Sequence, residues 1–203
     1  MTALGGTGAT ASRDHESSRI DPDLAKGIRL VGLDVDGVLT EGGIYLGDVD
    51  GAPLEFKRFD ILDGLGIKMM QLAGIDVAII TGRVSRAVAI RALELGITDV
   101  VQDKHARKLP ALRRLLAAKG IGVHEVAFVG DDLPDLAVLR VVGLPVVVAN
   151  CTDDVARLGA VRLTRDGGHG AVREFAEILL RARGQWDELV ERYVQSRSED
   201  PSS

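Results

Sequence analysis

The chain has 203 residues, of which 46% are hydrophobic and only 3% aromatic, and its formal net charge at pH 7 is -5. We therefore expect one core of aliphatic side chains, and nothing in the length demands a second domain. The negative charge and the lack of a long basic block argue against nucleic acid or an anionic membrane as the main partner, while an anionic small substrate stays possible through local cations.

No apolar stretch is long enough to cross a bilayer, and the N-terminus lacks the basic-then-apolar order of a secretory signal. The one cysteine, Cys151, cannot form an internal disulfide, which fits a reducing compartment. The expected location is therefore the cytoplasm.

Three parts are expected along the chain. Residues 1–25 are rich in Gly, Ser, Thr, Ala and charged residues without periodicity, which predicts a mobile segment with little to bury. Residues 26–183 carry the patterns of one α/β domain. Residues 184–203 contain an amphipathic stretch over 186–194, which predicts a helix, and a polar tail.

Four short apolar runs predict strands that are covered on both faces. They span residues 28–33, 75–80, 126–129 and 146–149. Between and after them, apolar residues at helical spacing predict helices, with Leu65, Met69 and Leu72 on one face, Leu109, Leu112 and Leu116 on another, and a further helix over 171–182. This alternation predicts a doubly wound parallel sheet.

One segment does not fit the alternation. Residues 42–46 and 53–59 flank a turn-rich linker over 47–51, which predicts a β-hairpin that projects after the first strand. An isolated hairpin is marginally stable, so we expect it to pack on the sheet or on another subunit. A decorated loop is the alternative.

The first apolar run leads directly into Asp34 and Asp36, which are followed by Gly37. Carboxylates at the carboxyl end of a buried parallel strand lie where open α/β sheets bind ligands. Two aspartates one residue apart, followed by a glycine that lets the backbone turn, can hold a hard cation and leave one carboxylate oxygen free to attack. For this pair alone, a merely polar strand end is the alternative.

Two later stretches offer groups for an anion. The second strand run ends in Thr81, Gly82 and Arg83, and a hydroxyl with backbone N–H groups at a strand-to-helix turn suits phosphoryl oxygens. Lys108 can offer a point charge to an aspartate or a phosphate, although a lysine on a solvated helix face is the alternative.

The third strand run ends in an acidic cluster, Asp131, Asp132 and Asp135. Carboxylates this close repel one another unless a cation or a proton intervenes. Asp131 and the aspartates of the first motif could hold Mg²⁺, which keeps waters and a substrate oxygen as its other ligands.

Together, Asp-x-Asp-Gly-Val-x-Thr from residue 34, then Thr81-Gly82, Lys108, and Gly-Asp-Asp-x-x-Asp from residue 130 resemble the haloacid dehalogenase (HAD) superfamily of phosphohydrolases over residues 28–150. The resemblance implies that Asp34 is the nucleophile that forms an aspartyl-phosphate and that Asp36 is the general acid and base. It implies that Thr81 and Lys108 bind the phosphoryl group. It also implies that Asp34, the Asp36 carbonyl and Asp131 are Mg²⁺ ligands, with Asp132 and Asp135 supporting the metal site. An acid at position 36, where ion pumps of the superfamily have threonine, favours turnover by water.

A narrower resemblance covers residues 28–183. The hairpin, residues 59–67, residues 79–83 and the Gly-Gly-His-Gly-Ala-Val-Arg-Glu segment from residue 167 are similar to 3-deoxy-D-manno-octulosonate 8-phosphate (KDO 8-P) phosphatases. This resemblance implies a Mg²⁺-dependent step of lipopolysaccharide biosynthesis that releases KDO and phosphate, and a Rossmann-like HAD sheet without a cap domain. It also implies a homotetramer in which hairpins assemble the subunits and a neighbouring subunit closes the site.

The same resemblance implies the residues that receive the sugar acid, namely Gly82, Arg83, Gly168, His169 and Gly170. Two positions depart from the family pattern. Leu62 stands where many relatives carry a basic residue, and Lys104 remains an alternative to Lys108 as the phosphate-binding lysine.

Other functions remain open from the sequence. A phosphatase for another sugar acid, such as a nonulosonate 9-phosphate, would use the same catalytic set. A signalling receiver domain also combines aspartates, Mg²⁺, threonine and lysine, but its acidic pair comes first and no hairpin intervenes, whereas Gly-Asp-Asp comes late here. A catalytically inactive member of the superfamily is disfavoured because no required residue type is missing.

Overall fold

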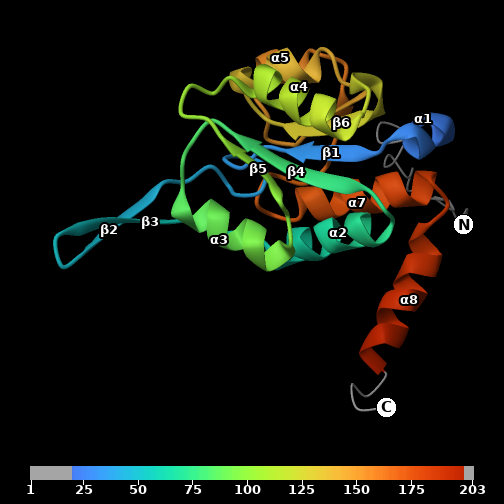
Figure 1. Ribbon diagram of the computed structural model, residues 1–203, viewed down its shortest axis with the longest axis horizontal. Helices are drawn as coiled ribbons and strands as arrows, with labels where there is room; N and C mark the ends of the chain where they lie inside the picture. Colours follow the sequence, from blue (N-terminus) through green and yellow to red (C-terminus); the bar gives the residue numbers. More distant parts are fainter. Residues whose placement is uncertain (1–19, 199–203) are drawn as a thin grey trace, which may run out of the picture.

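The computed structural model describes residues 20–198 and contains one central sheet of six parallel strands (Figure 1). The strands are β1 (Leu30–Leu33), β4 (Asp76–Thr81), β5 (Asp99–Gln102), β6 (Val126–Gly130), β7 (Leu144–Val147) and β8 (Val161–Arg162). Their order across the sheet is β5-β4-β1-β6-β7-β8. This is the α/β doubly wound architecture that the alternating pattern predicts.

Strand β1 lies at the centre of the sheet, between β4 and β6. Its four residues are all buried, which explains their uninterrupted apolar sequence. The chain runs outward from β1 to β4 and β5 and then crosses back to β6 on the other side. The order of the strands therefore reverses beside β1, and open α/β sheets bind ligands at the carboxyl end of that point.

Helices cover both faces of the sheet (Figure 1). One face carries α2 (Ile61–Leu72), α3 (Arg86–Leu95) and α7 (Ala171–Ala182), and the other carries α4 (Lys108–Lys119) and α5 (Leu136–Leu139). The short elements are the 3-10 turns η1 (Val123–Glu125) and η2 (Leu133–Asp135) and the helix α6 (Asp153–Ala156). Phe175 and Leu179 of α7 are completely buried, so this helix closes the core on its side. Helix α8 (Trp186–Ser198) extends away from the body.

The predicted hairpin is confirmed as β2 (Tyr45–Val49) and β3 (Ala52–Phe56), which project from the carboxyl edge of the sheet (Figure 1). Its turn is shorter than the linker expected over 47–51. Only Asp50 and Gly51 form it, with φ of 53° and 79°. Positive φ at both central residues is what a two-residue turn of the type favoured in hairpins requires, so the Asp-Gly pair sets the register.

Several elements differ from the sequence prediction. Strands β5 and β8 and helix α3 were not predicted, and β5 lacks a continuous apolar run because its residues are only half-buried. Leu72 is 49% exposed, although it was expected on the buried face of its helix. Helix α2 instead buries Ile67, Met69 and Met70, and it packs against α7.

The N-terminal expectation is only partly testable, because residues 1–19 lie outside the described residues. For residues 20–25 it is wrong, since Pro22–Gly27 forms helix α1. Asp21 caps this helix by accepting hydrogen bonds from the N–H groups of Asp23 and Leu24 at 2.9 and 3.0 Å, and Ala25 is completely buried. The division of the chain at residues 26 and 183 stays a prediction. Among the described helices, none has the length and apolar composition needed to cross a membrane.

Candidate active site

The site begins where β1 ends. The N–H of Asp34 donates to the carbonyl of Val129 in β6 at 3.1 Å, which continues the strand pairing to the first aspartate. The chain then folds back on itself, because the N–H and the hydroxyl of Thr40 both donate to the carbonyl of Val35, at 3.0 and 3.2 Å. Asp34 is only 5% exposed at the floor of this loop.

Lys108 links two buried carboxylates at this floor. Its Nζ lies 2.7 Å from Oδ1 of Asp34 and 2.7 Å from Oδ1 of Asp135. Burial by itself lowers the pKa of Lys108, but the charges of Asp34 and Asp135 outweigh it, and the pKa lies above its ordinary value. The ammonium group therefore stays charged, and the alternative of a solvated lysine does not apply. Lys104 is exposed.

Asp131 follows β6 and completes an acidic group with Asp34 and Asp135, in which carboxylate oxygens lie within 4.8 Å of one another. Burial raises the pKa of Asp34 to about 7, and burial together with the charge of Asp34 raises that of Asp131 to about 8. Asp132, the next residue, adds repulsion by its charge. The raised pKa values show that one ammonium group does not compensate the charge of three ionised carboxylates at this floor.

A hard cation fits this group. Among the described residues, Oδ1 of Asp131 is buried and has no hydrogen-bond partner. The backbone N–H of Asp131 donates to Oδ2 of Asp135 at 3.1 Å, so Asp135 is occupied by this bond and by Lys108. Carboxylate oxygens without histidine or cysteine suit Mg²⁺ rather than zinc. Asp131 thus has a buried oxygen to spare for a metal, and a carboxylate oxygen of Asp34 lies close enough to share the ion.

Thr81 ends β4, the strand next to β1, and is 2% exposed. Its Oγ1 accepts a hydrogen bond from the N–H of Arg83 at 3.3 Å. Gly82 passes close to the loop before α4, where a Cβ at this position would lie 2.8 Å from the Cβ of Ala106. The guanidinium group of Arg83 turns towards the first motif, with Nε 3.8 Å from Oδ2 of Asp36.

The segment over 167–170 lies against the first motif. The N–H of Gly168 donates to the carbonyl of Val38 at 2.9 Å, and Arg58 donates to the carbonyl of Gly168 at 2.7 Å. A Cβ at Gly168 would lie 2.4 Å from the backbone nitrogen of Glu41, so only glycine permits this approach. His169 is exposed, and its Nδ1 lies 3.0 Å from the carbonyl of Gly167.

Two charged residues with buried side chains in this region were not predicted as site residues. Lys57 follows β3 and forms an ion pair with Asp36, and Asp63 of α2 accepts a hydrogen bond from the N–H of Arg173 at 2.9 Å. Burial raises the pKa of Asp63 to about 6. The only sequence signal for Lys57 was a basic residue at the exit of the hairpin. Leu62, the departure noted above, is 44% exposed on α2.

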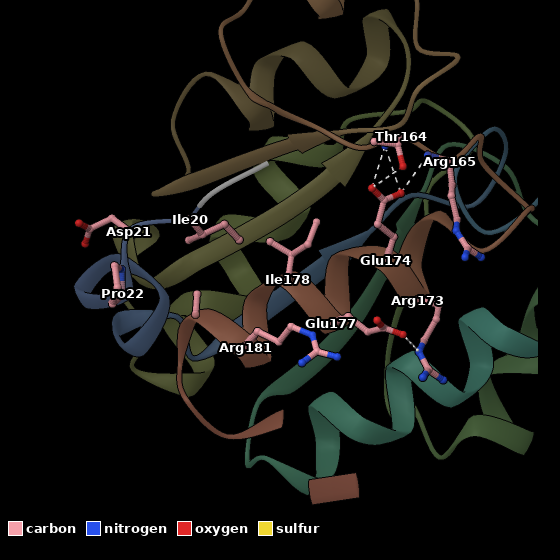
Figure 2. Close-up of a pocket in the computed structure, with 11 residues that line it drawn as sticks. Ile20, Asp21, Pro22, Thr164, Arg165, Arg173, Glu174, Glu177, Ile178 and Arg181 are labelled. Carbon is pink, nitrogen blue, oxygen red and sulfur yellow. Dashed lines mark hydrogen bonds and ion pairs between the residues drawn. The ribbon is translucent and has the colours of Figure 1, made fainter. Parts of the chain in front are cut away.

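A cavity of about 1010 Å³ lies elsewhere, along α7 and the start of α1 (Figure 2). None of the predicted site residues lines it. Its polar side chains largely satisfy one another, because Glu174 accepts from Thr164 and Arg165 at 2.8 to 3.1 Å and Arg173 pairs with Glu177 at 2.7 Å. The chemistry therefore concentrates at the carboxyl edge of the sheet and not in this cavity.

Known proteins resemble this chain over most of its length. A family model of haloacid dehalogenase-like hydrolases matches residues 95–161. The 3-deoxy-D-manno-octulosonate 8-phosphate phosphatase of Escherichia coli strain K12 is 44% identical over 171 residues, which covers 81% of this chain and 85% of that protein. The corresponding enzyme of Salmonella typhi is 43% identical over 164 residues, with coverages of 81% and 85%.

Solved structures give the same result. A 3-deoxy-D-manno-octulosonate 8-phosphate phosphatase from Moraxella catarrhalis, in complex with magnesium, phosphate and KDO, matches with a TM-score of 0.79 and 39% identity over 85% of this chain and 97% of that chain. The cobalt-bound form of the Haemophilus influenzae phosphatase matches with a TM-score of 0.72 and 36% identity over 79% and 92% of the two chains.

Proposed function

The chain belongs to the haloacid dehalogenase-like hydrolases and, within them, to the 3-deoxy-D-manno-octulosonate 8-phosphate phosphatases, and on this premise we propose how its own residues carry the reaction. The protein is a Mg²⁺-dependent phosphomonoester hydrolase that converts KDO 8-P to KDO and phosphate. The single observation that carries its assignment to this site is the buried Asp34, held by Lys108 at the carboxyl end of β1.

Asp34 is the nucleophile in this proposal. One of its carboxylate oxygens attacks phosphorus, the bond from phosphorus to the sugar oxygen breaks, and an aspartyl-phosphate forms. Asp36, as a carboxylic acid, gives its proton to the departing sugar oxygen. As a carboxylate, Asp36 then takes a proton from the water that attacks the aspartyl-phosphate, which releases phosphate and restores Asp34.

Thr81 and Lys108 hold the phosphoryl group. The hydroxyl of Thr81 lies at the end of the neighbouring strand, and the ammonium group of Lys108 is fixed by Asp34 and Asp135. A fixed positive charge in a site shielded from water stabilises the charge that develops on phosphoryl oxygens without needing to reorganise.

Asp34, Asp131 and the main-chain carbonyl of Asp36 would hold Mg²⁺, which would neutralise charge on the phosphoryl oxygens. Asp132 and Asp135 support this metal site. The role of Asp135 is supported by the hydrogen bond that it accepts from the N–H of Asp131 and by its ion pair with Lys108.

The sugar acid is received by Gly82, Arg83, Gly168, His169 and Gly170. The contacts of the segment over 167–170 with the first motif support this role, as does the position of Arg83 beside Asp36. A nonulosonate 9-phosphate is the second candidate substrate, because it would meet the same catalytic residues and differ only at this side of the site.

Assembly into a homotetramer would close the site, and the hairpin is the proposed contact. Its apolar side chains are exposed in the single chain: Ile44 by 55%, Tyr45 by 49%, Leu46 by 76%, Val49 by 57%, Leu54 by 37% and Phe56 by 56%. A patch of this kind marks an interaction surface, and pairing of hairpins would cover it. Phe59, at the end of the range expected for the hairpin, packs against the core and is not part of this surface. The proposed location is the cytoplasm and the proposed pathway is lipopolysaccharide biosynthesis.

The test of this function is phosphate release from a panel that contains KDO 8-P, a nonulosonate 9-phosphate and ordinary sugar phosphates, with Mg²⁺ present. We expect the highest kcat/KM for KDO 8-P. A higher kcat/KM for the nonulosonate ester would make that ester the substrate, and the proposed reaction would stand. Equal kcat/KM values across the panel would show that the enzyme is not specific for sugar acids.

A further inference from the structure

Lys57 combines complete burial with an unusual position. It follows β3 at the exit of the hairpin, and its side chain is 0% exposed, although most of the hairpin is solvated. Its Nζ contacts Oδ1 of Asp36 and lies 3.4 Å from Oε1 of Glu55. The ammonium group of Lys57, at the end of the hairpin, therefore lies against Asp36 of the first motif.

Arg83 closes this arrangement from the other side. Its Nε lies 3.8 Å from Oδ2 of Asp36, and its terminal nitrogen lies 2.9 Å from Oε1 of Glu55. Two cations and two carboxylates therefore alternate in a ring, and each carboxylate oxygen of Asp36 faces a different cation. Such a ring restricts the rotation of the Asp36 side chain.

The stability of the fold does not explain why a lysine is buried at position 57. Burial of an ammonium group costs free energy that an ion pair only partly returns, and apolar side chains of similar volume are often as stable. The ring instead has its main consequence at Asp36, because general acid catalysis requires the donor within hydrogen-bond reach of the departing oxygen.

We propose that Lys57 is a positioning residue, which holds the carboxyl group of Asp36 in line with the departing sugar oxygen, and that Glu55 keeps Lys57 in place. This inference rests on the proposed role of Asp36 as the general acid. It makes the hairpin part of the catalytic machinery of its own subunit, in addition to any role in assembly.

The test uses the dependence of the rate on the leaving group. An alkyl phosphate such as KDO 8-P needs a proton on its departing oxygen, whereas 2,4-dinitrophenyl phosphate does not. In Lys57→Met we expect kcat for KDO 8-P to fall about 10- to 100-fold, the cost of a misplaced catalytic group, with KM little changed. For the aryl ester, kcat also contains the attack of water that Asp36 assists, so the comparison uses kcat/KM, which ends with formation of the aspartyl-phosphate and should change by less than about threefold.

A matched control exists at the opposite edge of the sheet. Lys119 also bridges two carboxylates, with Nζ 2.9 Å from Oδ2 of Asp76 and 2.9 Å from Oδ2 of Asp99. Lys119→Met should leave the rates for both esters unchanged. Lys57→Gln is the second variant if the methionine variant does not fold, and it should show the same selective loss.

Asp36→Asn separates this inference from the proposed function. The asparagine variant should lose kcat/KM selectively on KDO 8-P, and adding Lys57→Met to it should cost nothing further, because Lys57 acts through Asp36. Equal losses of kcat/KM on both esters in the Lys57 variants, a loss on KDO 8-P confined to KM, or additive losses in the double variant would overturn the role of Lys57 alone. An Asp36→Asn variant without leaving-group selectivity would overturn the role of Asp36 and this inference together.

Discussion

Nζ of Lys108 lies 2.7 Å from Oδ1 of Asp34, and both side chains are more than nine-tenths buried. The pair joins the start of α4 to the carboxyl end of β1, and the two residues are 74 positions apart in the chain. A buried ion pair of this kind adds little net stability, but it fixes the direction of a nucleophile and of a phosphoryl-binding cation together.

Substitution of Lys108 should show whether Lys108 or Lys104 is the phosphate-binding lysine. In Lys108→Met, the carboxylates of Asp34 and Asp135 lose their buried partner, so the free energy of unfolding should fall by about 3–5 kcal/mol and phosphatase activity should be lost. Urea unfolding and phosphate release measure these effects. Lys104→Met is the control, since Lys104 is exposed. Loss of activity in the Lys104 variant with an active Lys108 variant would reverse the assignment.

Metal binding should depend on Asp131. Activity should disappear in excess chelator and return with Mg²⁺. Loss of a residue that only orients a metal ligand lowers metal affinity about 10- to 100-fold. Asp131→Ala removes a ligand itself, so it should weaken Mg²⁺ affinity by at least this factor. Calorimetric titration with Mg²⁺ measures this without turnover. Asp153→Ala, at the exposed start of α6, should bind Mg²⁺ like the unmodified protein. Full activity in excess chelator would contradict the prediction.

Asp63 should make the stability of the protein depend on pH. Burial raises its pKa in the folded state to about 6, above the ordinary value of 3.8, so the folded state binds more protons between these values. Stability should therefore fall as pH rises from about 4 to 6 and then level off. The free energy of unfolding relative to Asp63→Asn should drop by up to about 3 kcal/mol across this range.

Urea titrations at a series of pH values measure this difference. Asp23→Asn is the control, because the side chain of Asp23 is 96% exposed. A constant difference between the unmodified protein and Asp63→Asn would show that the carboxylate of Asp63 is ionised throughout and is stabilised by the N-terminus of α7.

The hairpin should determine assembly. A charge at Leu46, which is 76% exposed near the middle of β2, should oppose burial of the hairpin and give smaller species in sedimentation. Val194→Asp, at a 53% exposed position on α8, tests whether any added charge has this effect. Affinity for KDO 8-P should fall in Leu46→Asp while hydrolysis of a small aryl phosphate survives better. A fully active monomer at micromolar concentration would contradict the proposed closure.

The sequence predicted the centre of the fold because β1 and β6 are buried on both faces and therefore read as continuous apolar runs. The edge strand β5 escaped prediction because its half-buried residues leave no such run. The aspartates of the site could be predicted because they directly follow these apolar runs, and parallel strands bring their carboxyl ends to one edge of the sheet.

Lys57 could not be predicted because its partner is decided by the path of the hairpin. The Asp-Gly turn fixes the pairing of β2 with β3, and this pairing decides where residue 57 returns to the sheet. A shift of one residue in register would move its side chain to the other face. The spacing of Asp36 and Lys57 in the sequence therefore does not predict that they are in contact.

If Asp34 carries the phosphoryl group during turnover, chemical trapping should recover that group on residue 34. Enzyme turning over KDO 8-P is quenched with borohydride, which reduces an aspartyl-phosphate to homoserine, and the peptide that contains residue 34 is analysed by mass spectrometry. We predict homoserine at position 34 in the unmodified protein, and none in Asp34→Asn, which should fold but lose turnover by about 10³-fold or more because an amide is a poor nucleophile. Turnover without reduction at position 34, or substantial activity in Asp34→Asn, would contradict the account.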